Sequence, residues 1–156
     1  MKANTKTLIK CVAIPLFTGV ISGLISRGSM ATFGQLNKPP LSPPGWLFPV
    51  VWTILYALMG IASYLVFTST AKPSEITKAL KLYMLQLVVN FFWSIIFFNF
   101  GWYLFSFLWL ILLWVLIVLT IRQFYHIEKL AAYLMIPYLI WVTFAGYLNL
   151  GIYLLN

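Results

Sequence analysis

Long apolar stretches separated by short polar connections dominate the sequence. The longest stretch without Lys, Arg, Asp or Glu runs from Leu82 to Ile121. In helical form a stretch of this length reaches about 60 Å, which is two crossings of a hydrocarbon layer about 30 Å thick. The step Asn99-Phe100-Gly101 lies near its middle, where a tight turn is expected. The pattern therefore predicts two consecutive membrane-spanning helices.

The rest of the chain follows the same pattern. Residues 39–71 and 130–156 also lack full charges, and residues 11–26 form a shorter apolar run. We therefore predict an all-α fold, an integral membrane bundle of five transmembrane helices. The expected spans are residues 8–26, 46–68, 80–98, 103–121 and 130–154. The connections are too short to hold a soluble domain, so residues 1–156 are expected to form one domain.

The first apolar run has an alternative interpretation as a cleaved signal peptide, because Lys2, Lys6 and Lys10 precede it. Pro15 interrupts the run, and no A-x-A cleavage site follows it before Arg27. We therefore favour a retained first helix.

The strongest local signal runs from the first connection into the second predicted helix, in L-N-K-P-P-L-S-P-P-G-W-L-F-P-V-V-W at residues 36–52. Proline fixes φ and stiffens a connection, and this segment is crowded with it. Ser42 is a suitable N-cap, and Pro43 suits the first position of a helix. We expect a stiff cover that leads into an aromatic-lined helix.

Composition supports a membrane protein, since 63% of the residues are hydrophobic and only 8% are charged, against about 25% in soluble domains. The net charge of +8 is scattered over short connections, which argues against nucleic-acid binding. Most of it falls on the side of the N-terminus: Lys2, Lys6, Lys10, Lys72, Lys78, Lys81, Arg122 and Lys129. Only Arg27 and Lys38 fall on the other side. The positive-inside rule then predicts a cytoplasmic N-terminus and an external C-terminus.

Conventional catalytic chemistry finds little support. The chain has no Asp, and its two Glu residues lie outside the predicted spans, which excludes a Ser-His-Asp triad and an intramembrane carboxylate relay. His126 is expected to be a solvated residue in the fourth connection, and the single Cys11 a small buried apolar group. We predict no metal site, no cofactor and no conventional catalytic residue.

Three stripes of polar and aromatic side chains remain, one in each of the second, third and fifth predicted helices. They are Trp52, Tyr56 and Ser63; Gln86, Asn90, Trp93 and Phe97; and Pro137, Trp141, Ala145 and Asn149. Amides are costly in hydrocarbon, so Gln86 and Asn90 should face the bundle interior. Such stripes either hold helices together or line a pocket, and tryptophan beside small Ala145 and Gly146 favours space for a flat ligand. Pro137 is expected to bend the last helix. Gly19 and Gly23 form a G-x-x-x-G pattern that fits packing within the bundle or in a dimer.

Three blocks of sequence resemble the TspO/MBR family over nearly the whole chain. They are K-P-P-L-S-P-P-G-W-L-F-P-V-V-W-T-I-L-Y-A-L-M-G, L-Q-L-V-V-N-F-F-W-S-I-I-F-F and I-P-Y-L-I-W-V-T-F-A-G-Y-L-N. The resemblance implies a five-helix bundle, often dimeric, that binds porphyrins such as protoporphyrin IX and synthetic benzodiazepine-site ligands. Some bacterial members are reported to promote light-dependent porphyrin breakdown.

Carried over by motif, the resemblance implies a pocket between helices under the first loop. Its ligand-binding residues would be Phe33, Pro44, Trp52, Asn90, Trp93, Trp141 and Ala145. Relatives often have Tyr where this chain has Phe33, so a hydroxyl is missing there. The porphyrin would stack on Trp52 and Trp141, with its propionates toward Lys38 or Arg27.

The expected function is therefore a receptor-like membrane protein for porphyrins or other planar hydrophobic molecules, with membrane lipid and a second copy of the chain as further partners. Light- and oxygen-dependent porphyrin degradation, with Trp52 and Trp141 as the reacting residues, is one alternative. Tetrapyrrole transport is another, although no inverted repeat is evident. A sensor that acts through a partner protein is a third. The expected location is the cell membrane of a bacterium.

Overall fold

The computed structural model describes residues 4–156, which form helices and no β-strand. The long helices are α1 (Thr5–Ser26), α3 (Leu47–Phe67), α4 (Pro73–Ser94), α5 (Tyr103–Ile127) and α6 (Lys129–Leu155). Two short turns, η1 (Arg27–Ser29) and α2 (Met30–Gly34), follow α1, and a π-helical turn, η2 (Ile95–Asn99), continues α4. Within the described residues five helical segments are long and apolar enough to cross a membrane. The all-α, five-span prediction is confirmed.

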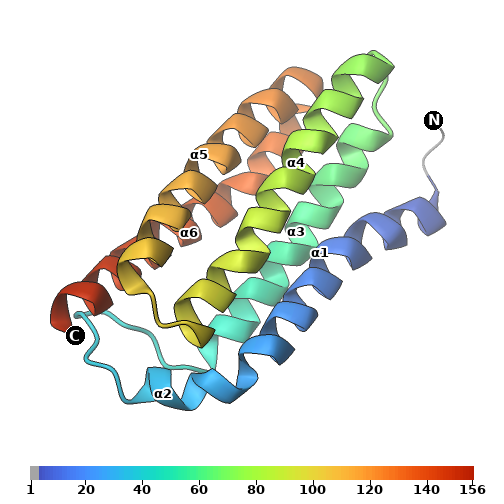
Figure 1. Ribbon diagram of the computed structural model, residues 1–156. Coiled ribbons are helices and arrows are strands. Elements are labelled where there is room, and N and C mark those ends of the chain that lie inside the picture. The colour runs from blue at the N-terminus through green and yellow to red at the C-terminus, as the bar shows by residue number, and fades with distance from the viewer. Residues whose placement is uncertain (1–3) are drawn as a thin grey trace.

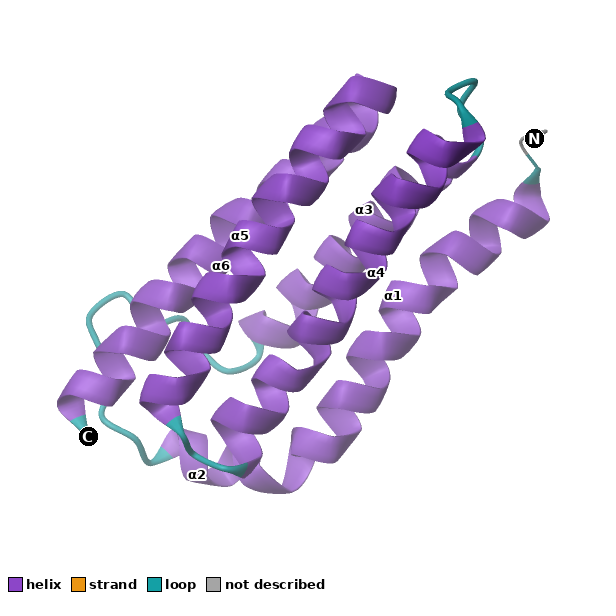
Figure 2. Cartoon of the chain, turned by 45° about the horizontal axis from the view of Figure 1, so that its top comes forward, coloured by secondary structure: helices purple, strands orange, loops and turns teal. Residues whose placement is uncertain are grey.

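The five long helices run side by side and close into a ring (Figure 1). Around the ring α1 packs on α3, α3 on α6, α6 on α5, α5 on α4, and α4 returns to α1. One end of the bundle, the lid end, holds α2, the loop of residues 35–46 and the end of α6 (Figures 1 and 2). The opposite, far end holds the start of α1 and the α3–α4 and α5–α6 connections. We call residues 35–46 the lid.

Basic residues divide between these two ends as the sequence predicts. The start of α1, the start of α4 and the α5–α6 junction place Lys6, Lys10, Lys72, Lys78, Lys81, Arg122 and Lys129 toward the far end. Arg27 and Lys38 lie at the lid end, and Lys2 falls outside the described residues. The basic residues are therefore concentrated at one end of the bundle, which is the kind of asymmetry that the positive-inside rule uses.

Two helices extend further than predicted. The α4 helix begins at Pro73 rather than near residue 80, because Pro73 suits the first turn and Glu75 favours the positive end of the helix dipole. The α5 helix continues to Ile127 rather than ending near residue 121. His126 therefore lies in the last turn of α5, and the prediction of a loop position was wrong, although the side chain is exposed. The charge of Arg122 marks where α5 leaves the hydrocarbon, but the helix itself continues beyond this residue.

The predicted helix start at Ser42 and Pro43 was wrong. The α3 helix begins at Leu47, whose N–H donates to the Pro44 carbonyl at 3.0 Å. Pro44 disfavours helical geometry at the residue before it, which is Pro43. The Ser42 hydroxyl instead donates to the Pro39 carbonyl at 2.7 Å and closes a turn within the lid.

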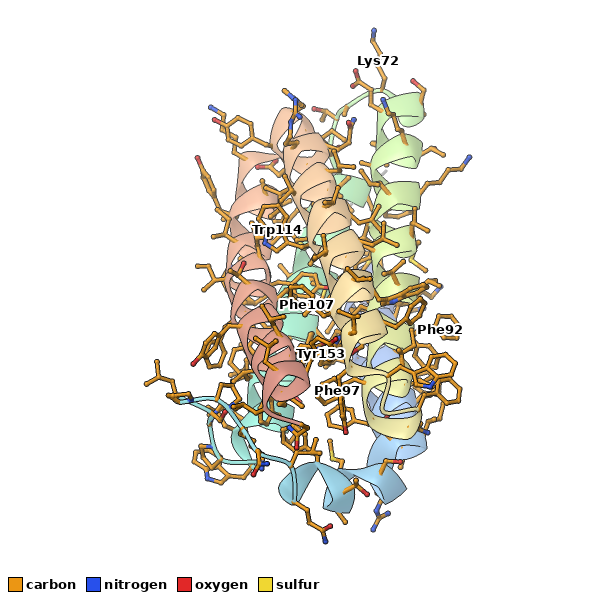
Figure 3. All side chains as sticks on the ribbon, turned by 60° about the vertical axis from the view of Figure 1, so that its left-hand side comes forward. Lys72, Phe92, Phe97, Phe107, Trp114 and Tyr153 are labelled. Carbon is orange, nitrogen blue, oxygen red and sulfur yellow. The ribbon has the colours of Figure 1, made fainter. Side chains whose placement is uncertain are left out.

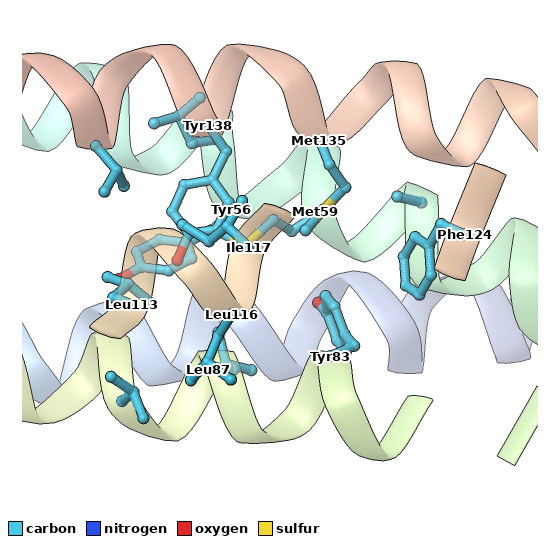
Figure 4. Packing of buried hydrophobic residues seen from close by; sticks show 14 of the residues in the cluster. Tyr56, Met59, Tyr83, Leu87, Leu113, Leu116, Ile117, Phe124, Met135 and Tyr138 are labelled. Carbon is cyan, nitrogen blue, oxygen red and sulfur yellow. The ribbon is translucent and has the colours of Figure 1, made fainter. Parts of the chain in front are cut away.

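The core lies between α3, α4, α5 and α6, and Met59, Ile117, Met135 and Tyr138 are fully buried in it (Figure 4). The α1 helix contributes little to this core, and its apolar outer face is exposed, as lipid contact requires. It is held instead by close approach of backbones. A Cβ atom at Gly60 of α3 would lie 2.8 Å from the Cys11 carbonyl oxygen.

The two glycines of the G-x-x-x-G pattern have different surroundings. Gly19 faces the ring of Tyr56, and a Cβ atom there would collide with the ring. A Cβ atom at Gly23 would meet nothing within 4 Å. The first glycine therefore serves packing within the bundle, while the second lies on an open face. The predicted turn at residues 99–101 is confirmed, with Gly101 at a φ of 64°.

Candidate ligand-binding site

The predicted polar stripes of α3 and α4 meet a tyrosine of α6 in a buried hydrogen-bonded network. The Tyr56 hydroxyl of α3 donates to Asn90 Oδ1 of α4 at 3.0 Å, and Asn90 Nδ2 donates to the Tyr138 hydroxyl of α6 at 2.6 Å. Tyr138 in turn donates to Gln86 Oε1 at 2.8 Å. Figure 4 shows Tyr56 and Tyr138 side by side in the core. Gln86 and Asn90 are 0% and 4% exposed, which confirms that these amides face the interior. We call these four residues the polar network.

An aromatic cluster covers the polar network on the side of the lid. Trp52 stacks on Tyr56, with ring centroids 5.4 Å apart, and meets the ring of Tyr138 edge-on at 6.1 Å. One turn closer to the lid, Phe48 meets Trp141 edge-on at 5.9 Å. Both tryptophans are half-buried and pack against the core rather than turning fully outward. Trp52 on α3 and Trp141 on α6 therefore line the same helix interface.

Phe33 of α2 links the aromatic cluster to the other side of the bundle. Its ring lies 6.0 Å from Phe48, 6.0 Å from Phe97 and 5.5 Å from Phe98. Phe97 and Phe98 both belong to the π-helical turn η2, and both contact the Phe33 ring. Phe97 lies above α2 in Figure 3. Trp93 completes this side, because its ring stacks on Phe97 at 5.4 Å. We call Phe33, Phe48, Trp52, Trp93, Phe97, Phe98 and Trp141 the aromatic cluster.

The indole N–H groups of Trp93 and Trp141 differ in whether they have a hydrogen-bond acceptor. Trp93 Nε1 donates to Asn149 Oδ1 at 3.1 Å. Trp141 Nε1 is buried and has no acceptor within residues 4–156. A buried donor without a partner costs about 1–3 kcal/mol. An acceptor on a bound molecule would remove that cost. Near the same cluster Lys38 Nζ lies 5.0 Å from the centre of the Phe33 ring and supplies a positive charge.

Most residues that the sequence marks as ligand-binding come together here. Phe33, Trp52, Trp93 and Trp141 belong to the aromatic cluster, and Asn90 lies beneath it in the polar network. Ala145 is buried in α6, one turn beyond Trp141. Pro44 is exposed in the lid, and its carbonyl caps the first turn of α3. Their role in binding stays a prediction.

Sequence reasoning missed Phe48 and Tyr138. The stripe drawn through Pro137 advanced four residues at each step, which drifts around a helix of 3.6 residues per turn. The α6 helix continues through Pro137, which is exposed. The buried face instead follows Met135, Tyr138, Val142, Ala145 and Asn149. Mixed steps of three and four from Asn149 would have found Tyr138.

The lid is fastened to the end of α6. Pro39 is buried against Gly151, and the Tyr147 hydroxyl donates to the Pro40 carbonyl at 2.7 Å. Asn37 N–H donates to Asn156 Oδ1 at 3.1 Å, while Asn156 Nδ2 donates to the Asn37 carbonyl at 2.8 Å. These contacts hold the lid beside the aromatic cluster.

Replacing Gly151 with valine is expected to lift the lid. A Cβ atom at Gly151 would lie 2.5 Å from Pro39 Cγ, and the Pro39 ring is too rigid to give way. Loss of the Asn37 hydrogen bond should speed hydrogen exchange at its amide about tenfold, which mass spectrometry can follow. Gly146→Val is the matched control, because a Cβ atom there meets only Leu110 at 3.8 Å. Equal exchange in both variants would contradict the fastening.

Comparison with known proteins finds relatives over nearly the whole chain. The model of the TspO/MBR family matches residues 11–155. The chain is 38% identical over 157 residues to the tryptophan-rich protein TspO of Chlorobaculum tepidum, covering 100% of this chain and 99% of that protein. It is 36% identical over 154 residues to the TspO protein of Archaeoglobus fulgidus, covering 98% and 99%. It is 33% identical over 141 residues to the translocator protein of Bos taurus, covering 87% and 82%. The chain, an integral membrane protein, therefore belongs to the TspO/MBR family.

Proposed function

We propose that the protein is a membrane receptor that binds a porphyrin, or another planar hydrophobic molecule such as a benzodiazepine-site ligand, in the aromatic cluster beneath the lid. Family membership supports a receptor or sensory role, since relatives carry the names tryptophan-rich sensory protein and translocator protein. The observation that carries the proposal is the buried Trp141 N–H, which has no acceptor within residues 4–156 and belongs to a side chain packed against the apolar core.

Ring contacts join the side chains of the aromatic cluster, so a ligand that stacks on these rings must part them. Edge-to-face pairs such as Phe33 with Phe48 and Phe48 with Trp141 have interplanar angles of 90° and 67°. Separating such a pair frees ring faces on which a large π system can stack. Binding therefore exchanges contacts among protein rings for contacts with the ligand. Lys38 would attract acidic groups of a porphyrin at the mouth of the site.

Removing both indoles tests the proposal. The double variant Trp52→Phe with Trp141→Phe is expected to raise the Kd for protoporphyrin IX about tenfold or more, because stacking area and one donor are lost. The shift of the porphyrin absorption band in detergent measures binding without relying on tryptophan fluorescence. The matched control is Trp102→Phe with Trp114→Phe, whose indoles are 57% and 40% exposed outside the cluster. Equal affinities for the two double variants would reject the site.

Light-dependent breakdown of the porphyrin is a second candidate function. Trp52 lies between two further oxidisable rings, with centroid distances of 5.4 Å to Tyr56 and 6.1 Å to Tyr138. An illuminated porphyrin passes energy to O₂, and the resulting singlet oxygen adds to electron-rich double bonds of the macrocycle or of an indole. Loss of porphyrin absorbance under aerobic illumination should then exceed the loss in the presence of an unrelated membrane protein. Equal rates of absorbance loss would indicate that the protein binds the porphyrin without breaking it down.

We also propose a bacterial cell membrane as the location, with the far end in the cytoplasm and the lid outside. The division of basic residues between the two ends supports this orientation. A thiol introduced at the lid, as in Ser42→Cys, should react in intact cells with a reagent that does not cross the membrane, while Ser74→Cys should not. The reverse pattern would overturn the orientation. The homodimer expected from the resemblance stays a prediction.

A further inference from the structure

A groove lies at the far end of the bundle, remote from the aromatic cluster. It has a volume of about 360 Å³. The end of α5 contributes Ile121, Arg122, Tyr125 and His126, and the start of α6 contributes Ala132, Tyr133 and Ile136. We call it the α5–α6 groove.

The groove arises from the way in which the two helices join. One residue, Glu128, separates α5 from α6, so the first turn of α6 starts directly beside the last turns of α5. Ala132 is small and buried, which leaves room between the helices. The exposed rings of Tyr125 and Tyr133, with centroids 6.2 Å apart, form an aromatic wall. Tyrosine with an apolar ring and a polar tip is typical of the boundary between headgroups and hydrocarbon.

The floor and the rim of the groove have different chemistry. Ile121 and Ile136 are apolar and lie on the hydrocarbon side, since α5 carries no charge between Tyr103 and Ile121. Arg122 and His126 lie on the rim with exposed side chains. Lys129 adds a third nitrogen-bearing group nearby, with Nζ 5.5 Å from the centre of the Tyr125 ring.

The charge of this rim is positive. Arg122 on α5 and Lys129 at the start of α6 are two full cations near it, and the half-buried Glu128 between the two helices is the one carboxylate of this junction. Guanidinium binds phosphate oxygens through two parallel hydrogen bonds, and lysine and histidine can add further donors. A cationic rim above an apolar floor matches a lipid with an anionic headgroup rather than a neutral one.

We propose that the α5–α6 groove binds one anionic phospholipid, with its phosphate on Arg122, His126 and Lys129 and an acyl chain along Ile121 and Ile136. The aromatic wall formed by Tyr125 and Tyr133 flanks the glycerol region. The site lies at the opposite end of the bundle from the aromatic cluster, so its occupancy does not depend on a porphyrin.

A second hollow at the same end has basic residues but lacks the other features of the α5–α6 groove, so it supplies a control. It has a volume of about 510 Å³ and is lined by Pro73, Ser74, Thr77, Lys78 and Lys81, all on α4. It carries two lysines but no aromatic wall and no second helix. Removing Lys78 and Lys81 therefore lowers the charge of the far end by the same amount as removing Arg122 and Lys129, without touching the proposed site.

Native mass spectrometry of the full chain in detergent, titrated with phosphatidylglycerol or phosphatidylcholine, tests the proposal. One phosphatidylglycerol is expected to bind preferentially, and Arg122→Gln with Lys129→Gln should weaken it about thirtyfold, to the level of phosphatidylcholine. Lys78→Gln with Lys81→Gln should change the affinity less than about twofold, because it alters only distant, screened charge. Circular dichroism checks that both variants keep their helices, and the exposed positions favour this.

Three outcomes would overturn the proposal. Equal affinity for the two lipids would show that the groove does not select charge. Equal losses in the two double variants would assign the preference to the whole basic end. Displacement of phosphatidylglycerol by millimolar inorganic phosphate or by glycerophosphoglycerol, neither of which has an acyl chain, would indicate an anion site without a lipid.

Discussion

Replacement of Gly60 by alanine is expected to push α1 away from α3 and to lower the Tm of the purified protein by about 4–10 °C, which corresponds to about 2–3 kcal/mol. The added Cβ atom would collide with Val12 Cα and lie 2.8 Å from the Cys11 carbonyl oxygen. Both neighbours are backbone atoms, which cannot rotate out of the way. The α1 helix buries few side chains, so it has little other packing to retain it.

Two further glycine substitutions serve as controls for Gly60→Ala. All three place alanine in a helix, which by itself is favourable. Gly23→Ala adds its methyl group to open space and should leave the Tm unchanged or slightly raised. Gly19→Ala presses on the Tyr56 ring and should lower the Tm to an intermediate degree. Thermal melting followed by circular dichroism measures the series, and a Gly60 variant as stable as the Gly23 variant would contradict the packing.

Replacement of Asn90 by leucine is expected to destabilise the protein by about 2–4 kcal/mol. Asn90 bonds both Tyr56 and Tyr138, so its loss leaves the buried Tyr56 hydroxyl without its acceptor, while the Tyr138 hydroxyl keeps its bond to Gln86. Hydrogen bonds between membrane helices average only about 0.6 kcal/mol each. The expected loss of stability therefore comes mainly from the stranded Tyr56 hydroxyl rather than from the lost bonds. Unfolding by a denaturing detergent provides the free energy.

A second substitution separates these two contributions. In the Asn90→Leu background, Tyr56→Phe removes one stranded hydroxyl and should recover part of the lost stability, although alone it destabilises. Thr120→Val is the control for removing a buried hydroxyl, because Thr120 bonds only the Leu116 carbonyl of its own helix. If Tyr56→Phe lowers stability further in that background, the stranded hydroxyl is not the cause.

The amino-acid sequence predicts the helices of this protein well because hydrocarbon allows few alternatives. A charge-free stretch such as residues 82–121 must satisfy its backbone internally, and a helix is the simplest way to do so. The ends are harder to predict, because residues such as Arg122 leave the hydrocarbon while the helix continues in water. The five spans were predicted correctly, but the start of α4 and the C-terminal end of α5 were not.

The candidate site was predictable to a lesser degree. The amides of Gln86 and Asn90 had to face inward, because nothing in lipid could satisfy them. Phe48 gave no comparable signal, since a phenylalanine suits lipid and protein equally well. The lid was harder still. Its geometry depends on contacts between Asn37 and Asn156, which are 119 residues apart, and no local pattern encodes such a pairing.

That separation has a consequence for how the protein is made. Residues 35–46 leave the ribosome long before Tyr147 and Gly151 are synthesised, so the loop has nothing to rest on until the final helix has entered the bilayer. During this interval Phe33, Phe48 and Trp93 lack this cover, and Trp141 of the last helix joins them only when the cover does. A molecule captured at that stage would be enclosed as translation ends, without the cost of reopening a finished protein.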